Sequence, residues 1–195
     1  MNLEMYRSKS RGVLQALRLY NTEISAGDGR VVFDLTADTV IKVAINKGRW
    51  SIKQNELEIA RSPKLNPEFI TRVLDSSDDG KWLVMEKAYL SDQMSITKEI
   101  RSHFGGKTKG HLLAMYMINQ NPIEELYDPK LWESYTTRCR RSSWFRGFCD
   151  TFYEAGYRYP DLNEENFMFN QNNQLVVVDY GIDYPLRDVK RCCWF

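Results

Sequence analysis

The segment YPDLNEENFMFNQNNQLVVVDYG, residues 159–181, carries three oxygen-bearing side chains at a notable spacing. Asp161 precedes Asn166 by five residues, and Asp179 directly follows the apolar run 175–178. Carboxylate and amide oxygens are ligands that Mg²⁺ accepts together with phosphate oxygens and water. The segment therefore predicts a magnesium-phosphate site with Asn166 and Asp179 as ligands and with Asp161 placed to accept a proton from a hydroxyl substrate. A hairpin whose polar residues only cap turns is the alternative.

Short apolar runs elsewhere in the chain predict further strands. RVVFDL (30–35) and ADTVIKVA (37–44) form a predicted hairpin around the polar turn 36–38. FITRVLDSS (69–77) and KWLVMEKA (81–88) form a second one around Asp78-Asp79-Gly80. Within the opening segment, FMF and LVVVD are two more short strands.

Helical patterns separate and follow these strands. Periodic apolar residues predict helices over 3–20, 47–61, 111–119 and about 130–156, and residues 91–110 read as a flexible loop. Pro63 and Pro67 end the second helix. Because the first 90 residues are strand-rich and the rest is mostly helical, the sequence predicts an α+β protein with two lobes and a cleft between them.

Lys42 lies inside an apolar predicted strand, between Ile41 and Val43. Strand alternation places it on the same face as Val40 and Ala44, so we expect it to point inward and to need an acidic partner. The following helix offers Glu56 and Glu58, and the sequence does not decide between them. Paired with one of them, Lys42 could hold an anion such as a phosphate. An edge-strand lysine that prevents aggregation is the alternative.

Gly27 and Gly29 precede the first predicted hairpin. Glycines allow backbone N–H groups to approach a phosphate closely, although a Gly-x-Gly pair is also typical of a simple turn.

Composition limits the remaining possibilities. The net charge of the 195 residues is +1, which argues against a broad nucleic-acid-binding surface. No apolar run reaches the length of a membrane span, and the N-terminus lacks the apolar core of a signal peptide, so we expect a cytoplasmic protein, in the host cytoplasm if it is viral. The four cysteines form no Cys-x-x-Cys pair, so a zinc site is not expected. The terminal CCWF fits a prenylation pattern, but an ordinary aromatic tail is the simpler interpretation.

Six segments follow one another in a suggestive order: GDGRVVFDL, TVIKVA, KQNELEIA, LVMEKA, YPDLNEEN and VVVDYG. This order resembles the protein-kinase-like fold, whose pattern has a glycine loop, a lysine on the third strand, a helix glutamate, H-R-D-L-x-x-x-N and D-F-G. The similarity covers residues 22–182 and looks closest to the small kinase-like proteins of bacteria and their phages. It implies a two-lobed α+β fold. Residues 1–88 would be an N-lobe with an N-terminal helix, a glycine loop, antiparallel strands and one main helix, and residues 89–195 would be a truncated, mostly helical C-lobe.

The resemblance also implies roles for individual residues, with ATP and Mg²⁺ as cofactors. Gly27 and Gly29 would belong to the glycine loop. Lys42 would hold the α- and β-phosphates, with Glu56 or Glu58 as its partner. Met85, Glu86 and Ala88 would form the hinge that meets the adenine. Asp161 would be the catalytic base, and Asn166 and Asp179 would bind magnesium.

The chain departs from the kinase pattern in several places. Tyr159-Pro160 replaces the His-Arg of the catalytic loop, Asn163 stands where a lysine is usual, and Val32 replaces the third glycine. Residues 182–195 are too few for an activation segment and the later C-lobe helices.

Two main functions remain open from the sequence, and transfer of AMP or another group by the same fold is a third possibility. The first is an ATP- and magnesium-dependent kinase that transfers the γ-phosphate to a hydroxyl of a protein or small molecule, and the complete set of Lys, Glu, Asp, Asn and Asp favours it. The alternative is a pseudokinase that binds or inhibits a partner or host protein without catalysis, and the missing activation segment favours that. The sequence does not name the acceptor, the partner or the oligomeric state.

Overall fold

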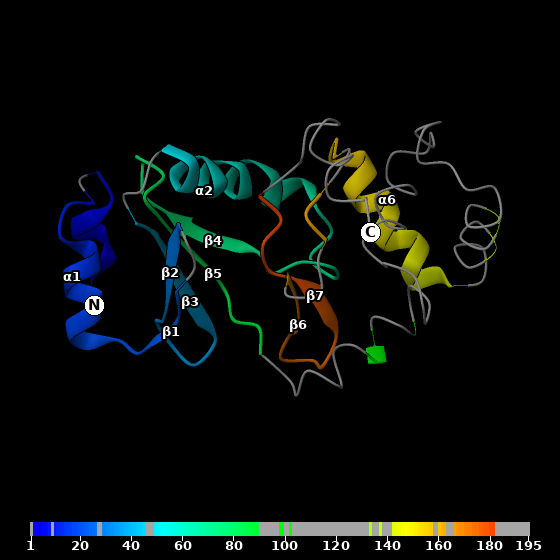
Figure 1. Cartoon of the computed structure of the whole chain (residues 1–195), viewed down its shortest axis with the longest axis horizontal. Coiled ribbons are helices and arrows are strands. Elements are labelled where there is room, and N and C mark those ends of the chain that lie inside the picture. The colour runs from blue at the N-terminus through cyan, green and yellow to red at the C-terminus, as the bar shows by residue number, and fades with distance from the viewer. Residues whose placement is uncertain are drawn as a thin grey trace, which may run out of the picture. The chain divides into compact units, whose positions relative to one another are not determined.

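The computed structural model describes residues 2–8, 10–26, 29–45, 49–89, 98–99, 102, 133, 137, 142–157, 160–162 and 166–181 (Figure 1). The chain divides into two compact units. The first comprises Met1–Pro63 with Thr71–Lys87, and the second comprises Lys64–Ile70 with Ala88–Phe195. Most of the predicted loop 91–110 and most of residues 130–142 of the last predicted helix lie outside the described residues. The predicted helix over 111–119, Gly27 and residues 182–195 lie wholly outside them.

A five-stranded antiparallel sheet forms the centre of the first unit, which makes the protein α+β. In spatial order its strands are β1 (Glu23–Ala26), β2 (Arg30–Asp34), β3 (Thr39–Ala44), β5 (Trp82–Glu86) and β4 (Val73–Ser76). Both predicted hairpins are confirmed, since β2 pairs with β3 and β4 pairs with β5. The edge strand β1 was not predicted, because all four of its residues are exposed and show no apolar alternation.

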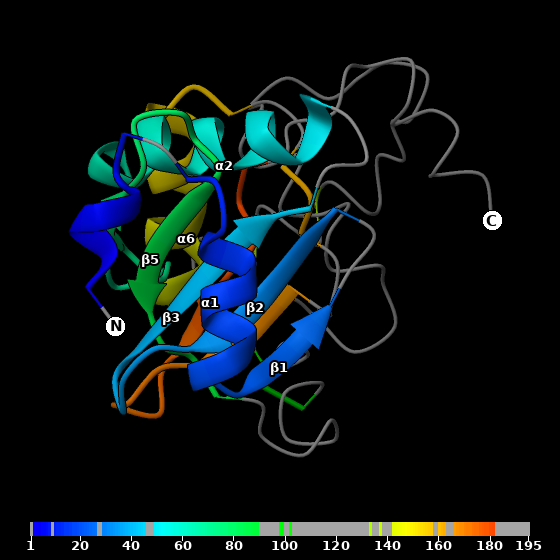
Figure 2. The same ribbon diagram turned by 90° about the vertical axis from the view of Figure 1, so that its left-hand side faces the viewer.

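One face of this sheet packs against helix α1 (Val13–Tyr20), which crosses the strands in Figure 2. Alternate residues of the central strands face the helix, because side chains of a strand point to opposite faces in turn. The resulting core consists of Val13, Leu17, Val31, Phe33, Ile41, Val43, Trp82 and Val84. The opposite face therefore carries the other residues of the same strands, among them Lys42.

The single helix predicted over 3–20 is wrong. A short 3₁₀ helix, η1 (Leu3–Tyr6), is separate from α1, and Gly12 between them has a φ of 87°. This left-handed conformation, which glycine adopts readily, cannot continue a right-handed helix. The two elements therefore take independent directions.

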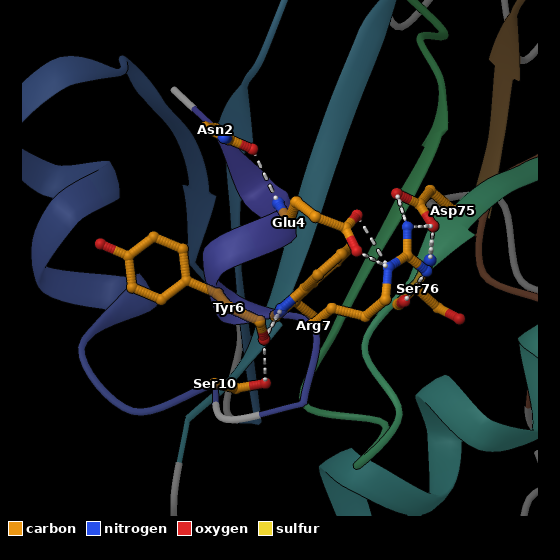
Figure 3. A network of polar contacts seen from close by, with 8 residues as sticks. Asn2, Glu4, Tyr6, Arg7, Ser10, Asp75 and Ser76 are labelled. Atoms are coloured by element: carbon orange, nitrogen blue, oxygen red, sulfur yellow. Dashed lines mark hydrogen bonds and ion pairs between the residues drawn. The ribbon is translucent and has the colours of Figure 1, made fainter.

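The residues around η1 bind the β4–β5 hairpin (Figure 3). Arg7 Nη2 lies 2.9 Å from Asp75 Oδ1, and the Arg7 carbonyl accepts a hydrogen bond from the Asp78 amide at 3.0 Å. The indole N–H of Trp82 donates to the Tyr6 carbonyl at 3.1 Å. In a continuous helix, the carbonyls of Tyr6 and Arg7 would instead accept hydrogen bonds from amides of the same helix.

Helix α2 (Arg49–Arg61) lies within the predicted 47–61 and continues into the short 3₁₀ helix η2 (Ser62–Lys64). It is attached to the turn between β4 and β5, because Asn55 Nδ2 donates to the Gly80 carbonyl at 2.9 Å. A Cβ at Gly80 would lie 2.9 Å from Glu56 Cγ and 3.3 Å from Ile52 Cγ2, so the turn approaches the helix closely. Glycine at this position thus permits both the contact and the φ of 66°.

The second unit contains helix α6 (Ser143–Glu154) and the antiparallel hairpin β6 (Phe167–Phe169) and β7 (Leu175–Val177). The hairpin was predicted, and the helix lies within the predicted 130–156. The Ser142 hydroxyl caps α6 by accepting from the Phe145 amide. An aromatic core joins the helix to its surroundings and comprises Phe69, Trp144, Phe148, Phe152, Tyr157 and Phe167.

No helix within the described part of the chain combines the length and the apolar character needed to span a bilayer.

Candidate nucleotide and magnesium site

Lys42 is buried in the first unit, as strand alternation predicts, and only 5% of it is exposed. Its ammonium lies 3.3 Å from Glu58 Oε2, and Glu58 itself has no exposed surface. Of the two glutamates that the sequence left open, Glu58 is therefore the one that contacts Lys42. Glu56 is exposed on the same helix, where its side chain covers Gly80.

A third buried charge belongs to the same cluster. Arg30, at the start of β2, places Nη1 2.7 Å from Glu58 Oε1 and 3.4 Å from Asn55 Oδ1. Two cations thus share one carboxylate, each on its own oxygen. Isolated buried charges are unfavourable, so the contacts with the Glu58 carboxylate offset part of the cost of burying the two cations.

Arg30 was not among the predicted site residues, although a signal exists. The register pairs Val32 directly with Lys42, and Arg30 lies two positions before Val32. Residues two apart on a strand share a face, so Arg30 and Lys42 project from the same side of the sheet. Once the hairpin register is known, the sequence therefore shows a second charged residue on the same face of the sheet as the inward lysine.

Gly29 lies directly before β2, and its carbonyl accepts a hydrogen bond from the Ile45 amide at 2.9 Å. A Cβ at this position would lie 3.1 Å from Ser51 Cβ of α2. Close packing against the helix is thus a reason for glycine here that is independent of any phosphate.

The residues predicted to form the hinge lie at the end of β5, where some of their backbone groups are already hydrogen-bonded to other parts of the first unit. Met85 is fully buried, the Glu86 amide donates to the Arg72 carbonyl at 3.1 Å, and the Lys87 amide donates to the Asp38 carbonyl at 2.8 Å. An adenine contact in this stretch would therefore have to use other groups, namely the Glu86 carbonyl or the Ala88 N–H. The side chain of Glu86 is held by Arg72.

In the second unit, Asp161, Asn166 and Asp179 come together at one end of the β6–β7 hairpin. Asn166 immediately precedes β6, and Asp179 follows β7 after one residue. The pairing of Phe167 with Val177 places these two positions at the same end of the hairpin. The side chain of Asn166 is buried, and its Nδ2 donates to the Asp161 carbonyl at 2.8 Å.

Backbone and side-chain contacts hold this arrangement in place. The Val178 amide donates to the Asn166 carbonyl at 2.9 Å, which extends the hairpin by one pair. Tyr180 is fully buried and its carbonyl accepts a hydrogen bond from the Tyr157 hydroxyl, so the residue after Asp179 is anchored to the end of α6. Asp161 and Asp179 themselves are half-buried.

The donor chemistry of this cluster fits magnesium. Because the Asn166 nitrogen is directed at Asp161, the amide oxygen is the atom that could serve as a ligand, together with a carboxylate oxygen of Asp179. One carboxylate and one amide, completed by phosphate oxygens and water, are sufficient for Mg²⁺. Within the described residues there is no group of three or more His, Cys, Asp or Glu side chains able to hold a metal.

No protein-family model matches the chain, and no curated protein matches it. Among solved structures, it is similar to the GDP complex of wild-type aminoglycoside 2′-phosphotransferase-IIIa, at 15% identity over 93% of this chain and 73% of the other, with a TM-score of 0.40. The gentamicin complex of APH(2″)-IIa matches at 14% identity over 88% and 69%, with a TM-score of 0.41. The streptomycin–ATP ternary complex of APH(2″)-IIa matches at 16% identity over 93% and 71%, with a TM-score of 0.37. Because these TM-scores are below 0.5, the likeness does not establish a shared fold or activity, and the candidate site rests on its own contacts.

Proposed function

We propose that the protein is a protein-kinase-like phosphotransferase that binds ATP with Mg²⁺ and transfers the γ-phosphate to a hydroxyl acceptor. The observation that carries this proposal is the buried ion pair between Lys42 of a central strand and Glu58 of α2. A lysine in such a position is expensive to bury, and its fixed charge is suited to a polyphosphate.

The arrangement of the second unit supports the same proposal. The amide oxygen of Asn166 and the carboxylate of Asp179 would hold magnesium, which when bound neutralises charge on the phosphates. Asp161 would orient the acceptor hydroxyl and take its proton. In the transfer, the acceptor oxygen forms a bond to the γ-phosphorus, the bond from that phosphorus to the β–γ bridging oxygen breaks, and ADP leaves.

The proposal includes the architecture implied by the resemblance, with residues 1–88 as the N-lobe and 89–195 in the C-lobe. Gly27, Gly29, Met85, Glu86 and Ala88 would contribute to nucleotide binding through their backbone. The sheet order, with the lysine strand in the middle, and the position of the Lys–Glu pair support this assignment. An ATP-dependent role would fit a cytoplasmic protein.

A transfer assay tests the proposal. The full chain is incubated with ATP labelled at the γ-phosphate and Mg²⁺, with the protein itself, a model protein substrate or an aminoglycoside as acceptor. Wild-type protein should transfer label to at least one acceptor class. Asp161→Asn should reduce transfer by about 10²–10⁴-fold while ATP affinity changes little, because a general base contributes in that range.

Two outcomes would count against the proposal in different ways. If Asp161→Asn lost ATP binding and transfer equally, Asp161 would be structural and the assigned base would be wrong. If wild-type protein bound magnesium-ATP but transferred phosphate to none of these acceptors, a pseudokinase that engages a partner protein would replace the kinase.

A further inference from the structure

Arg30 and Lys42 approach Glu58 in different ways. Arg30 Nη1 lies 2.7 Å from Oε1, a short charge-assisted contact, whereas Lys42 Nζ lies 3.3 Å from Oε2. The carboxylate is therefore held between two cations from adjacent strands, and the arginine contact is the tighter of the two. All three side chains are at least nine-tenths buried.

Arg30 also fixes the helix that carries the carboxylate. Asn55 and Glu58 are three residues apart on α2 and so lie on one face of it. Arg30 donates to both, and Asn55 in turn donates to the Gly80 carbonyl. The guanidinium thus links β2 to two neighbouring positions of the helix and indirectly to the β4–β5 turn.

The shared carboxylate has a consequence for Lys42. As long as Arg30 occupies Oε1, Glu58 offers Lys42 a single oxygen. Without the guanidinium, the carboxylate could turn and present both oxygens to the ammonium, which would draw Lys42 toward α2. The same loss would also remove the hydrogen bonds from Arg30 of β2 to Asn55 and Glu58 of the helix.

We propose that Arg30 is a positioning residue, which acts through Glu58 to set the place of the Lys42 ammonium for the phosphates of ATP. The inference rests on the proposed role of Lys42 in nucleotide binding. It assigns Arg30 no direct contact with the nucleotide, and this distinguishes it from a second phosphate-binding cation.

The test is a double-mutant cycle read out as the dissociation constant for magnesium-ATP of the folded protein. The variants are Arg30→Met, Arg30→Lys and Glu58→Gln, alone and combined. Arg18→Met is the matched control, since Arg18 is an exposed arginine of the same unit that pairs with Glu23 at 3.8 Å. Thermal unfolding of each variant without nucleotide gives the purely structural effect separately.

Arg30→Met should weaken magnesium-ATP binding by about tenfold to a hundredfold, as expected for losing a hydrogen bond between charged groups. Arg30→Lys should recover part of that loss, and Arg18→Met should change affinity by less than about twofold. In the Glu58→Gln background, Arg30→Met should weaken binding by less than about a further twofold, because residues acting through one another are not additive. If Arg30→Met does not fold, Arg30→Lys is compared in its place. It should weaken magnesium-ATP binding by about threefold or more when Glu58 is present, but not in the Glu58→Gln background.

Three results would overturn the inference. Wild-type affinity in Arg30→Met would show that Arg30 serves stability alone. A full additional loss in the Glu58→Gln background would show direct contact with the phosphates. If the wild-type protein does not bind ATP at all, the proposed function itself is wrong. If the wild type and Arg30→Met bind ATP equally well, only the role of Arg30 is wrong, so the two failures can be told apart.

Discussion

Glu58 is the residue on which the Lys42 half of the proposed site depends. It is fully buried and faces both Arg30 and Lys42. Glu58→Gln keeps the shape of the side chain but leaves two buried cations facing a neutral amide, so we expect the free energy of unfolding to fall by about 3–5 kcal/mol. The exposed Glu56 offers a matched control, and Glu56→Gln should stay within about 0.5 kcal/mol of wild type.

Urea unfolding of the two variants at neutral pH measures this difference. Equal stability of Glu58→Gln and Glu56→Gln would contradict the buried pair. The comparison also distinguishes the two glutamates between which the sequence did not decide.

Asp79 gives a second prediction at the residue scale. Burial raises the pKa of its carboxyl, but hydrogen bonds from the Ser10 and Ser77 hydroxyls and from the Lys81 amide, with the Lys81 charge, outweigh burial and hold the pKa below the ordinary value of 3.8. A carboxyl whose pKa is lower in the folded state adds stability above its unfolded pKa and loses it as the pH falls through the folded pKa. The contribution of Asp79 should therefore be complete at neutral pH and decline below about pH 4.

The measurement is the free energy of unfolding of wild type and Asp79→Asn across this pH range. The wild type should be the more stable protein at neutral pH, and the difference should shrink as the pH is lowered below about 4. A pH-independent difference between the two proteins would show that Asp79 acts without its charge. Asp78→Asn, at the exposed neighbouring position, is the control.

Individual residues show which parts of the candidate site can be predicted from the sequence. The inward direction of Lys42 follows from strand alternation alone. The choice of Glu58 over Glu56 does not, because it depends on how α2 rotates against the sheet, and that rotation is set by Asn55 and Gly80. Arg30 was not predicted because its place on the face of Lys42 follows only from the register of β2 and β3, which the sequence alone does not give.

At the scale of elements, the β4–β5 turn connects the N-terminal segment with α2. Ser10 donates to Asp79 at 2.7 Å on one side of the turn, and Asn55 donates to Gly80 on the other. The turn therefore determines where α2 lies and, through α2, where Glu58 meets Lys42.

Gly80→Ala and Gly12→Ala test this connection as a matched pair. Both glycines have a positive φ, so each substitution should destabilise the protein by about 1–2 kcal/mol. A Cβ at Gly12 meets nothing within 4 Å, whereas a Cβ at Gly80 would press on Glu56 and Ile52 of α2. Gly80→Ala should therefore be less stable than Gly12→Ala by about a further 1 kcal/mol and should also weaken magnesium-ATP binding.

Thermal unfolding and ATP titration of the two variants give the answer. If Gly80→Ala matched Gly12→Ala in both stability and ATP affinity, the turn would not control α2.

Elements with buried apolar alternation could be predicted from the sequence, and others could not. The strands β2, β3 and β5 carry β-branched and apolar residues in runs that no helix would favour. The edge strand β1 is exposed throughout and has no such pattern. The prediction of one helix over 3–20 is wrong because it assigned Leu3 and the apolar residues of α1 to one periodicity. Gly12 and the hydrogen bonds between the N-terminal segment and the hairpin interrupt that helix.

At the scale of the whole molecule, the composition of the two halves of the sequence is sufficient to predict an α+β protein. The proposed function depends on residues from both units: Lys42 and Glu58 in the first, and Asp161, Asn166 and Asp179 in the second. The contacts described above hold the residues of each group within their own unit. The proposal requires that one nucleotide bind both groups.

Titration of the full chain with ATP, in the presence and absence of Mg²⁺, tests this requirement most directly, with the free energy of unfolding as the readout. Magnesium-ATP should stabilise the wild type by about 2.7 kcal/mol at a hundredfold excess over the dissociation constant, and ATP alone should stabilise it less. Lys42→Met should reduce both effects, and Asp179→Asn should remove the magnesium-dependent part. Asp150→Asn, an exposed change on α6, should behave as wild type. Unchanged stability of the wild type with ATP and Mg²⁺, or an Asp179→Asn variant that keeps the full magnesium-dependent gain, would contradict the account.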